Sequence, residues 1–371
     1  MSVTIAGGVV RRQSLEHTIR STLETDEHLL VRKHDIVYNM MRMWQGAAGI
    51  AKEDGVVSPA YVVCRPLDGI DPLFAHHLFR TPRMIYLFWA YSHGLTDDRR
   101  RLYFDDFARV PILLPRVQEQ QTIADLLSKW DSAIDQTVSI IEAKDRRRQG
   151  LVHQLLTGQR RFPEFRGQKR TSTRLGAVLT KISNGVEVDP LKIYQEIGIR
   201  SHGKGVFHKD PVQGTSLGEK RVFEVVPGCL TLNIVFAWER ALAVTTENEV
   251  GMIASHRFPM FRPDPDRVSI EFVLHYMLSD VGHNVLKLAS PGGAGRNRTI
   301  SQEQFLKTKI PLPSLAEQHR IVECINSADL ELRSFKRYLD ALRKQKRGLM
   351  QKLLTGEVRV PHSLLKKGAK S

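Results

Sequence analysis

The chain has 371 residues, enough for two or three domains with cores of their own, and its 42% hydrophobic and 26% charged residues disfavour extensive disorder. It has neither an apolar run of membrane-spanning length nor a basic start followed by an apolar stretch, so we expect a cytoplasmic protein with no membrane partner. A net charge of +15 predicts affinity for a polyanion.

The first part of the chain, residues 1–111, has the pattern of a mixed α and β domain. β-Branched and aromatic runs at 34–40 and 59–65 predict strands, and residues 73–91 predict a helix. His76 and His77 lie in that helix without further ligands at metal spacing, so we expect them on its surface.

Residues 112–163 follow with a helical pattern. Pro115 stands before the helix, where proline is tolerated, and Gly158 follows a Leu-Leu-Thr run, where a left-handed residue can end it. Asp131 and Ser132 are good helix caps and predict a break between two helical pieces. One apolar seam runs along the region through Ile123, Leu127, Trp130, Ile134, Ile141, Leu151 and Leu155.

A second mixed domain and a second helical region complete the chain. Runs at 228–236 and 256–262 predict strands, and residues 270–288 predict a helix. Residues 310–361 repeat residues 112–163 without a gap, 198 positions further along. The identical pairs include Pro115/Pro313, Glu119/Glu317, Gln120/Gln318, Ile123/Ile321, Asp131/Asp329, Gly158/Gly356 and Arg161/Arg359.

The repeat extends into the globular parts. Arg100 and Phe107 match Arg298 and Phe305 at the same offset, and Trp44 matches Trp238 at an offset of 194. Matched tryptophans favour core packing over stacking on a ligand. The second helical region has a seam like the first, and the charged outer faces favour pairing of the two helices with each other over separate packing on their own neighbours. We therefore predict an α+β fold in which two mixed α/β globular domains alternate with two long helical regions.

A catalytic role is disfavoured by the motifs that the sequence lacks. An adenine methyltransferase needs an Asn/Asp-Pro-Pro-aromatic motif, and no Pro-Pro pair occurs. Residues 198–204 resemble a phosphate-binding loop, but Gly205 stands where a Ser or Thr would hold magnesium, so we predict a simple turn. Three distant cysteines cannot form a four-cysteine zinc site. We predict no catalytic residue and no metal.

The repeated motif resembles one known family. The stretch "IPLPSLAEQHRIV" (310–322) leading to "LMQKLLTGEVRV" (349–360), with its weaker copy "ILLPRVQEQQTIA" (112–124) to "LVHQLLTGQRRF" (151–162), is similar to the specificity (S) subunit of type I restriction–modification systems. Nearly the whole chain takes part in this resemblance.

The resemblance implies two target recognition domains, each reading half of a bipartite site in double-stranded DNA, and two helical spacer regions that pair as an antiparallel coiled coil. It implies partners, namely two modification (methyltransferase) subunits and the restriction (translocase/nuclease) subunits. This chain then needs no cofactor, and S-adenosylmethionine is expected on the modification subunits. The implied order is domain 1 (1–111), spacer 1 (112–163), domain 2 (168–309), spacer 2 (310–361) and a basic tail (362–371).

Basic and amide side chains in loops are the expected DNA contacts, because arginine reads guanine, asparagine reads adenine and both grip phosphates. The matched loops "DDRRRLYF" and "GRNRTISQ" place such side chains at corresponding positions, and Arg11 and Arg12 are further candidates in the first domain. For the Glu-Gln pairs we expect helix-end hydrogen bonding or subunit docking. The predicted DNA contacts are Arg99, Arg100, Arg101, Arg200, His202, Lys204, Arg296, Asn297 and Arg298, and the predicted helix-start residues are Glu119, Gln120, Glu317 and Gln318.

The two copies differ at their starts. Residues 168–194 have no counterpart before Met1, whereas the family's first domain opens with such a segment. The alternative reading is therefore a half-specific or inactive relative, a DNA-binding scaffold in which only the second domain reads DNA.

Overall fold

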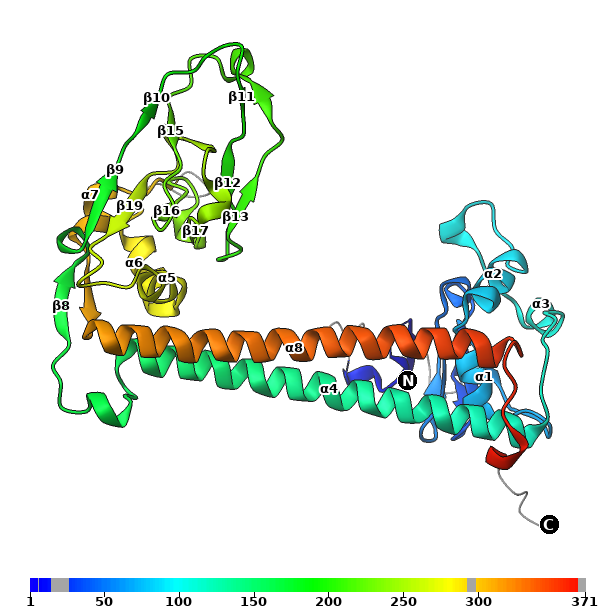
Figure 1. Ribbon diagram of the computed structural model, residues 1–371. Coiled ribbons are helices and arrows are strands. Elements are labelled where there is room, and N and C mark those ends of the chain that lie inside the picture. Colours follow the sequence, from blue (N-terminus) through cyan, green and yellow to red (C-terminus); the bar gives the residue numbers. More distant parts are fainter. Residues whose placement is uncertain (6, 15–26, 292–297, 366–371) are drawn as a thin grey trace. The chain divides into compact units, whose positions relative to one another are not determined.

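The computed structural model describes residues 1–5, 7–14, 27–291 and 298–365 (Figure 1). By internal contacts the chain forms two compact units. Unit 1 consists of Met1–Ile140 and Phe335–Ser371, and unit 2 of Ile141–Ser334. Two long helices, α4 (Val117–Thr157) and α8 (Leu315–Leu354), each contribute one end to unit 1 and the other end to unit 2.

In its described residues, unit 1 combines small antiparallel sheets with three short α-helices. β4 lies between β5 and β7, β1 pairs with β2, and β3 pairs with β6. The strands are β1 (Ser2–Thr4), β2 (Gly8–Val10), β3 (Leu29–Val31), β4 (Ile36–Asn39), β5 (Ala48–Ile50), β6 (Gly55–Val57) and β7 (Tyr61–Cys64). The helices are α1 (Pro72–Leu78), α2 (Pro82–Ala90) and α3 (Phe104–Ala108), with a single 3-10 turn η3 (Met43–Gln45) between β4 and β5.

Unit 2 repeats this plan with more strands. Its largest sheet has the order β17-β16-β19-β9, and β10-β15-β18 forms a second sheet. The strands are β8 (Thr171–Arg174), β9 (Leu179–Ile182), β10 (Gly185–Val186), β11 (Ile193–Tyr194), β12 (Ile197–Ile199), β13 (Val206–His208), β14 (Val212–Gln213), β15 (Val222–Glu224), β16 (Leu230–Leu232), β17 (Leu242–Val244), β18 (Ile253–Ser255), β19 (Met260–Pro263) and β20 (Lys309–Leu312). The helices are α5 (Ile270–Leu278), α6 (Asp280–Leu288) and α7 (Gln302–Lys307), with 3-10 turns η6 (Leu175–Ala177) and η8 (Ala237–Glu239).

The predicted α+β class is confirmed, and so are strands at the four predicted runs (β4, β7, β16 and β19). Each predicted globular helix is, however, a pair of short helices. Thr81 caps α2 and Pro82 occupies its first turn, where proline ends the preceding helix and begins the next. Ser279 caps α6 in the same way and separates it from α5.

The predicted break at Asp131 and Ser132 is wrong, because α4 runs through both residues. The Asp131 carboxylate does not cap a helix but accepts a hydrogen bond from Lys346 on α8. Both long helices end where the sequence predicts, since Gly158 and Gly356 take left-handed conformations with φ of 81° and 75°.

The apolar seam of the long helices serves two purposes. Near the middle of α8, Leu332, Leu339 and Leu342 are buried on a helix whose other faces are exposed. The ends of the helices also complete the globular cores. Ile123, Ala124, Leu127, Leu353 and Leu354 belong to the core of unit 1, and Leu155, Leu156, Ile321 and Ile325 to that of unit 2.

The expectation that His76 and His77 lie on a helix surface is wrong for His77, whose exposed fraction is 3%. Because α1 packs with this face inward, the His77 imidazole lies 4.0 Å from the Asp131 carboxylate. Burial, with Arg80 and Lys346 nearby, lowers the pKa of His76 to about 3 and that of His77 to about 4.

None of the helices in the described ranges combines the length and apolar character needed to cross a bilayer.

Candidate nucleic-acid interface

The Glu-Gln pairs at the starts of α4 and α8 organise the chain around each helix end. Gln120 accepts a hydrogen bond from the Asp71 amide (2.9 Å) and donates to the Gly69 and Pro115 carbonyls (2.9 and 2.8 Å). Gln318 makes the matching bonds with the Ser269 amide and the Arg267 and Pro313 carbonyls (2.9, 3.0 and 2.9 Å). Both glutamines have an exposed fraction of 0%. Each therefore ties a short helix to the start of a long one.

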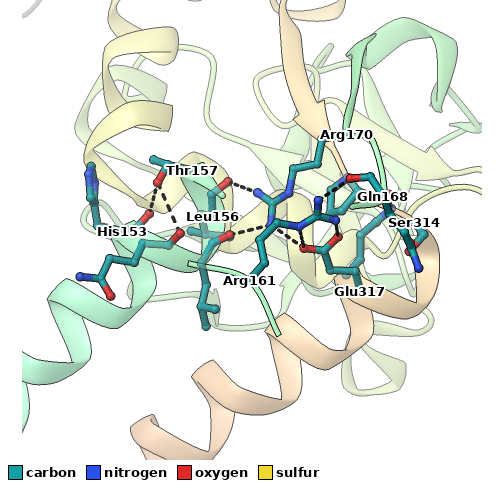
Figure 2. Close-up of polar contacts among 12 residues, drawn as sticks. His153, Leu156, Thr157, Arg161, Gln168, Arg170, Ser314 and Glu317 are labelled. Atoms are coloured by element: carbon teal, nitrogen blue, oxygen red, sulfur yellow. Dashed lines mark hydrogen bonds and ion pairs between the residues drawn. The ribbon is translucent and has the colours of Figure 1, made fainter. Parts of the chain in front are cut away.

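The two glutamates join the copies to each other. Glu119, at the start of α4, binds Arg359, which follows the end of α8 in unit 1. Glu317, at the start of α8, binds Arg161 and Arg170, which follow the end of α4 in unit 2 (Figure 2). Arg170 also donates to the Leu155 and Leu156 carbonyls at the end of α4. In each unit the helices are thus antiparallel, and each clamp joins the start of one long helix to the segment that follows the other, with one arginine on Glu119 and two on Glu317.

A second ion pair is also repeated. Asp131 pairs with Lys346 in unit 1, and its counterpart Asp329 pairs with Arg148 in unit 2. Arg161, Arg170 and Arg359 were not predicted to be helix clamps, although Arg161/Arg359 is an identical pair in the repeat.

We expect Gln120→Ala and Gln318→Ala to destabilise different units. Each change leaves an amide N–H and two carbonyls, partly buried around Gln120 and mostly buried around Gln318, with fewer partners, which costs about 1–3 kcal/mol of unfolding free energy. Hydrogen exchange should show faster opening of residues 69–75 in Gln120→Ala and of residues 267–273 in Gln318→Ala. Faster exchange in both regions for either variant would contradict the separate roles.

The predicted residues Arg200, His202 and Lys204 share the loop between β12 and β13 in unit 2, and this confirms the predicted turn. All three are exposed. The His202 amide donates to the Glu239 carbonyl (2.8 Å) and the Gly203 amide to the Arg240 carbonyl (2.9 Å), so η8 supports the loop. His202 takes a left-handed φ of 62° to make this turn.

Arg298 also lies beside η8. Its guanidinium is 5.7 Å from the centroid of the Trp238 ring, while the Trp238 indole N–H donates to the Val235 carbonyl (3.1 Å). Trp238 is half-buried, as is its counterpart Trp44, which donates to the Met41 carbonyl. We call the surface formed by Arg200, His202, Lys204, Trp238, Arg240 and Arg298 the basic face of unit 2.

Arg240 is held in this face by a network that the sequence did not indicate. It donates to Asp280 (2.6 Å) and to Nδ1 of His283 (3.0 Å), and Nε2 of His283 lies 2.9 Å from the Trp238 carbonyl. Burial lowers the pKa of His283, so the neutral imidazole accepts from Arg240 and donates to the carbonyl. α6 thereby fixes the direction of the Arg240 side chain.

In unit 1 the predicted arginines lie between α2 and α3. Arg99 and Arg101 are exposed, whereas Arg100 is half-buried, stacks on Trp89 at 4.4 Å and donates to the Ser92 carbonyl (3.2 Å). The buried Ser92 and its counterpart Ser290 both donate to the preceding helix, at the Phe88 and Leu286 carbonyls. Ser92 and Ser290, which precede the two predicted arginine stretches, are therefore held in the same way in the two units.

The other predicted contacts lie elsewhere. Arg11 forms a salt bridge with Glu53, and Arg12 is half-buried in a 3-10 turn. Arg296 and Asn297 lie outside the described residues.

Comparisons with known proteins agree with this architecture. Residues 233–339 match the family model of the type I restriction modification DNA specificity domain. The putative type I restriction enzyme MjaX specificity subunit of Methanocaldococcus jannaschii is 23% identical over 78% of this chain and 69% of its own length. The type I restriction enzyme MjaVIII specificity subunit of the same organism is 21% identical over 91% and 82%.

Solved structures show the same fold. The HsdS subunit from Thermoanaerobacter tengcongensis superposes with a TM-score of 0.51 at 17% identity, covering 91% of this chain and 84% of that one. The type I restriction-modification S subunit from M. genitalium gives 0.50 at 16% identity, covering 91% and 86%.

The fold and the repeated helix clamps define a class of tandem scaffold proteins, with two recognition-type domains completed by the ends of two long helices. Within that class the chain is a relative of the specificity subunits of type I restriction–modification systems, as the sequence motif predicted.

Proposed function

We propose that this chain is the DNA-recognition subunit of a type I restriction–modification complex, with each unit reading one half of a bipartite target. The observation that supports this most is that Arg100 and Arg298 follow matching Ser92 and Ser290 bonds in the two units, within stretches whose sequences otherwise differ. Side chains of different chemistry at corresponding positions are what two domains need if each recognises a different half-site. The specificity-subunit family is non-catalytic, and the chain then supplies recognition and scaffold.

The proposal also includes partner subunits, which would carry out the chemical reactions. Two modification subunits would bind S-adenosylmethionine and methylate adenine, and restriction subunits would translocate and cut DNA. Gln120, Glu317 and Gln318 are buried and inaccessible to a partner, so we assign the docking of these subunits to the charged outer faces of α4 and α8.

Co-expression with a cognate modification subunit tests the proposal directly. We expect the proteins to co-purify, and genome-wide mapping of methylated adenines should give a bipartite site with an internal gap. A complex that does not form, or that adds no adenine methylation, would refute the function. Methylation at a single or symmetric half-site would refute reading by unit 1.

For Arg298→Ala we expect a loss at one half-site only. Removal of a base-reading arginine costs about 1–3 kcal/mol of binding free energy, roughly 5-fold to 150-fold in affinity, and relaxes sequence preference at its position. Binding to a panel of half-site variants measures this, with Arg100→Ala as the matched control for the other half-site. An equal loss on every sequence would instead mark a phosphate contact.

A further inference from the structure

The 3-10 turns η3 and η8 are equivalent turns that end in different residues. In each turn, an asparagine side chain accepts a hydrogen bond from the amide two residues further along, and the tryptophan indole donates to the carbonyl of that same residue. Both turns end in a left-handed residue, Gly46 with a φ of 87° and Arg240 with a φ of 60°. This conformation suits glycine but strains a residue that has a Cβ atom. The turn itself therefore does not require the arginine that unit 2 places there.

The helix that packs on each turn differs at the matching position. A Cβ atom on Gly46 would lie 2.9 Å from the Cδ1 atom of Ile85 on α2, so unit 1 leaves little room for a side chain at the end of η3. The residue of α6 that corresponds to Ile85, 198 positions further along, is His283. In unit 2, Nδ1 of His283 lies 3.0 Å from Nη2 of Arg240. Unit 2 thus has an arginine at the end of the turn together with a polar partner on the helix above it.

His283 and Asp280 hold the guanidinium group of Arg240 in one orientation. A guanidinium only donates and a carbonyl only accepts, so the bonds of His283 to Arg240 and to the Trp238 carbonyl (2.9 Å) require a neutral ring. The Asp280 carboxylate accepts from the same Nη2 atom (2.6 Å). Within the described part of the chain, Nη1 of Arg240 makes no hydrogen bond, and the side chain is 27% exposed. An oriented guanidinium therefore keeps a donor for a ligand.

A second strained residue lies against this turn. Among the described residues, positive φ occurs outside glycine at His34, His202 and Arg240. Two of these meet, because the loop that contains His202 donates its amides to the last two carbonyls of the turn, those of Glu239 and Arg240. Strained backbone persists mainly where a function needs a particular side chain in a particular place. Its concentration here marks this part of the basic face as functional.

We propose that Arg240 is a specificity-determining residue that reads the acceptor edge of a guanine in the half-site of unit 2, and that His283 and Asp280 are its positioning residues. Arginine on guanine is the commonest specific contact in the major groove. A base contact needs a side chain held in one direction, whereas an exposed side chain such as Lys204 can follow the phosphate backbone. Unit 1 makes no such contact from this position, because Gly46 has no side chain. This inference rests on the proposed function.

The test compares Arg240→Gly with the wild-type chain, each in complex with a cognate modification subunit. Glycine is the residue that unit 1 uses here, so the turn should form, and urea unfolding checks this. Affinity for the target duplex should fall about tenfold or more, a difference of about 1.4 kcal/mol. Mapped adenine methylation should become degenerate at one guanine position of a single half-site. Arg240→Asn, whose side chain tolerates a left-handed backbone, should lose the same preference.

Two variants of His283 test the positioning role. His283→Leu removes both hydrogen bonds of the ring and should relax the same guanine position as Arg240→Gly. His283→Gln can still accept from Arg240 and donate to the Trp238 carbonyl, so it should restore the preference. A structural role alone would lower the urea midpoint without changing the sequence preference, and that result would refute positioning by His283.

Three results would overturn the assignment of Arg240: an unchanged sequence preference in Arg240→Gly, an equal loss of affinity on every sequence, which would mark a phosphate contact, or relaxation in both half-sites. If the wild-type complex reads a bipartite site and the Arg240→Gly complex reads it equally well, this inference alone fails. If the wild-type chain directs no methylation, the proposed function fails, and the inference fails with it.

Discussion

Glu317→Ala is expected to lower the stability of unit 2 by about 3–5 kcal/mol, because it leaves two largely buried guanidinium groups without their carboxylate. Glu317 is 0% exposed, and the side chains of its partners Arg161 and Arg170 are 17% and 10% exposed. The loss should appear in urea unfolding as a lower midpoint with an unchanged slope.

The repeat provides a matched control in unit 1. Glu119→Ala removes the same carboxylate, but its partner Arg359 is 66% exposed and can be hydrated, so we expect a clearly smaller loss. In sequence, Arg170 corresponds to Gly368, which has no side chain to form such a pair, and among the described residues the double clamp is found in unit 2. Equal losses in the two variants would contradict this account.

The clamp also predicts a pH effect. Burial raises the pKa of Glu317, but hydrogen bonds from Arg161 and Arg170 outweigh it and hold that pKa below its usual value. The stabilisation is therefore complete above pH about 4.5 and is lost as pH falls through the lower pKa of the folded state.

Mild acid is expected to destabilise unit 1 through His76 and His77. Their pKa values of about 3 and 4 lie below the ordinary 6.5, so between these values only the unfolded chain takes up the protons. Stability therefore falls as pH drops from 6.5, and the loss stops growing below the folded pKa values. At pH 5 the two imidazoles together cost about 4 kcal/mol, from 1.36 kcal/mol per pH unit for each.

Thermal unfolding at pH 7 and pH 5 measures this effect. The double variant His76→Asn/His77→Gln should lose most of the decrease, because neither replacement titrates. Glu119 and Asp35 keep their charge in this window, since arginine partners hold their pKa values low. An unchanged decrease in the double variant would contradict the assignment. Burial also lowers the pKa of His275, the counterpart of His77, so unit 2 should show a related decrease.

The sequence predicted well those features that recur in it. The apolar seams, the glycines that end α4 and α8, and the placement of two equivalent loops all follow from local pattern and from the repeat. The break at Asp131 was predicted wrongly, because a capping residue and an interhelical ion-pair partner look alike until the opposite helix is known. The prediction for His77 was wrong for the same reason, because its environment includes Asp131 and Lys346, which are distant from it in sequence.

The candidate interface was predictable only in part. Arginine and lysine in loops could be named, but which of them stack or pair depends on tertiary contacts, as for Arg100 on Trp89 and Arg298 on Trp238. Arg240 was missed because its support comes from Asp280 and His283, forty and more residues away. In the sequence, the matched pair Trp44 and Trp238 was the signal that could have drawn attention to η8, which supports the loop of residues 200–204.

Because unit 1 takes residues from both ends of the chain, the two units are completed in a fixed order during synthesis. Unit 2 is a continuous segment, Ile141–Ser334, so all of it is synthesised before the C-terminal residues that complete unit 1. Unit 1 begins first but takes Leu353, Leu354 and Arg359 from the far end of the chain. The core of unit 1 therefore stays incomplete until these residues have been synthesised, and a premature stop near residue 345 would spare unit 2 while leaving the core of unit 1 incomplete.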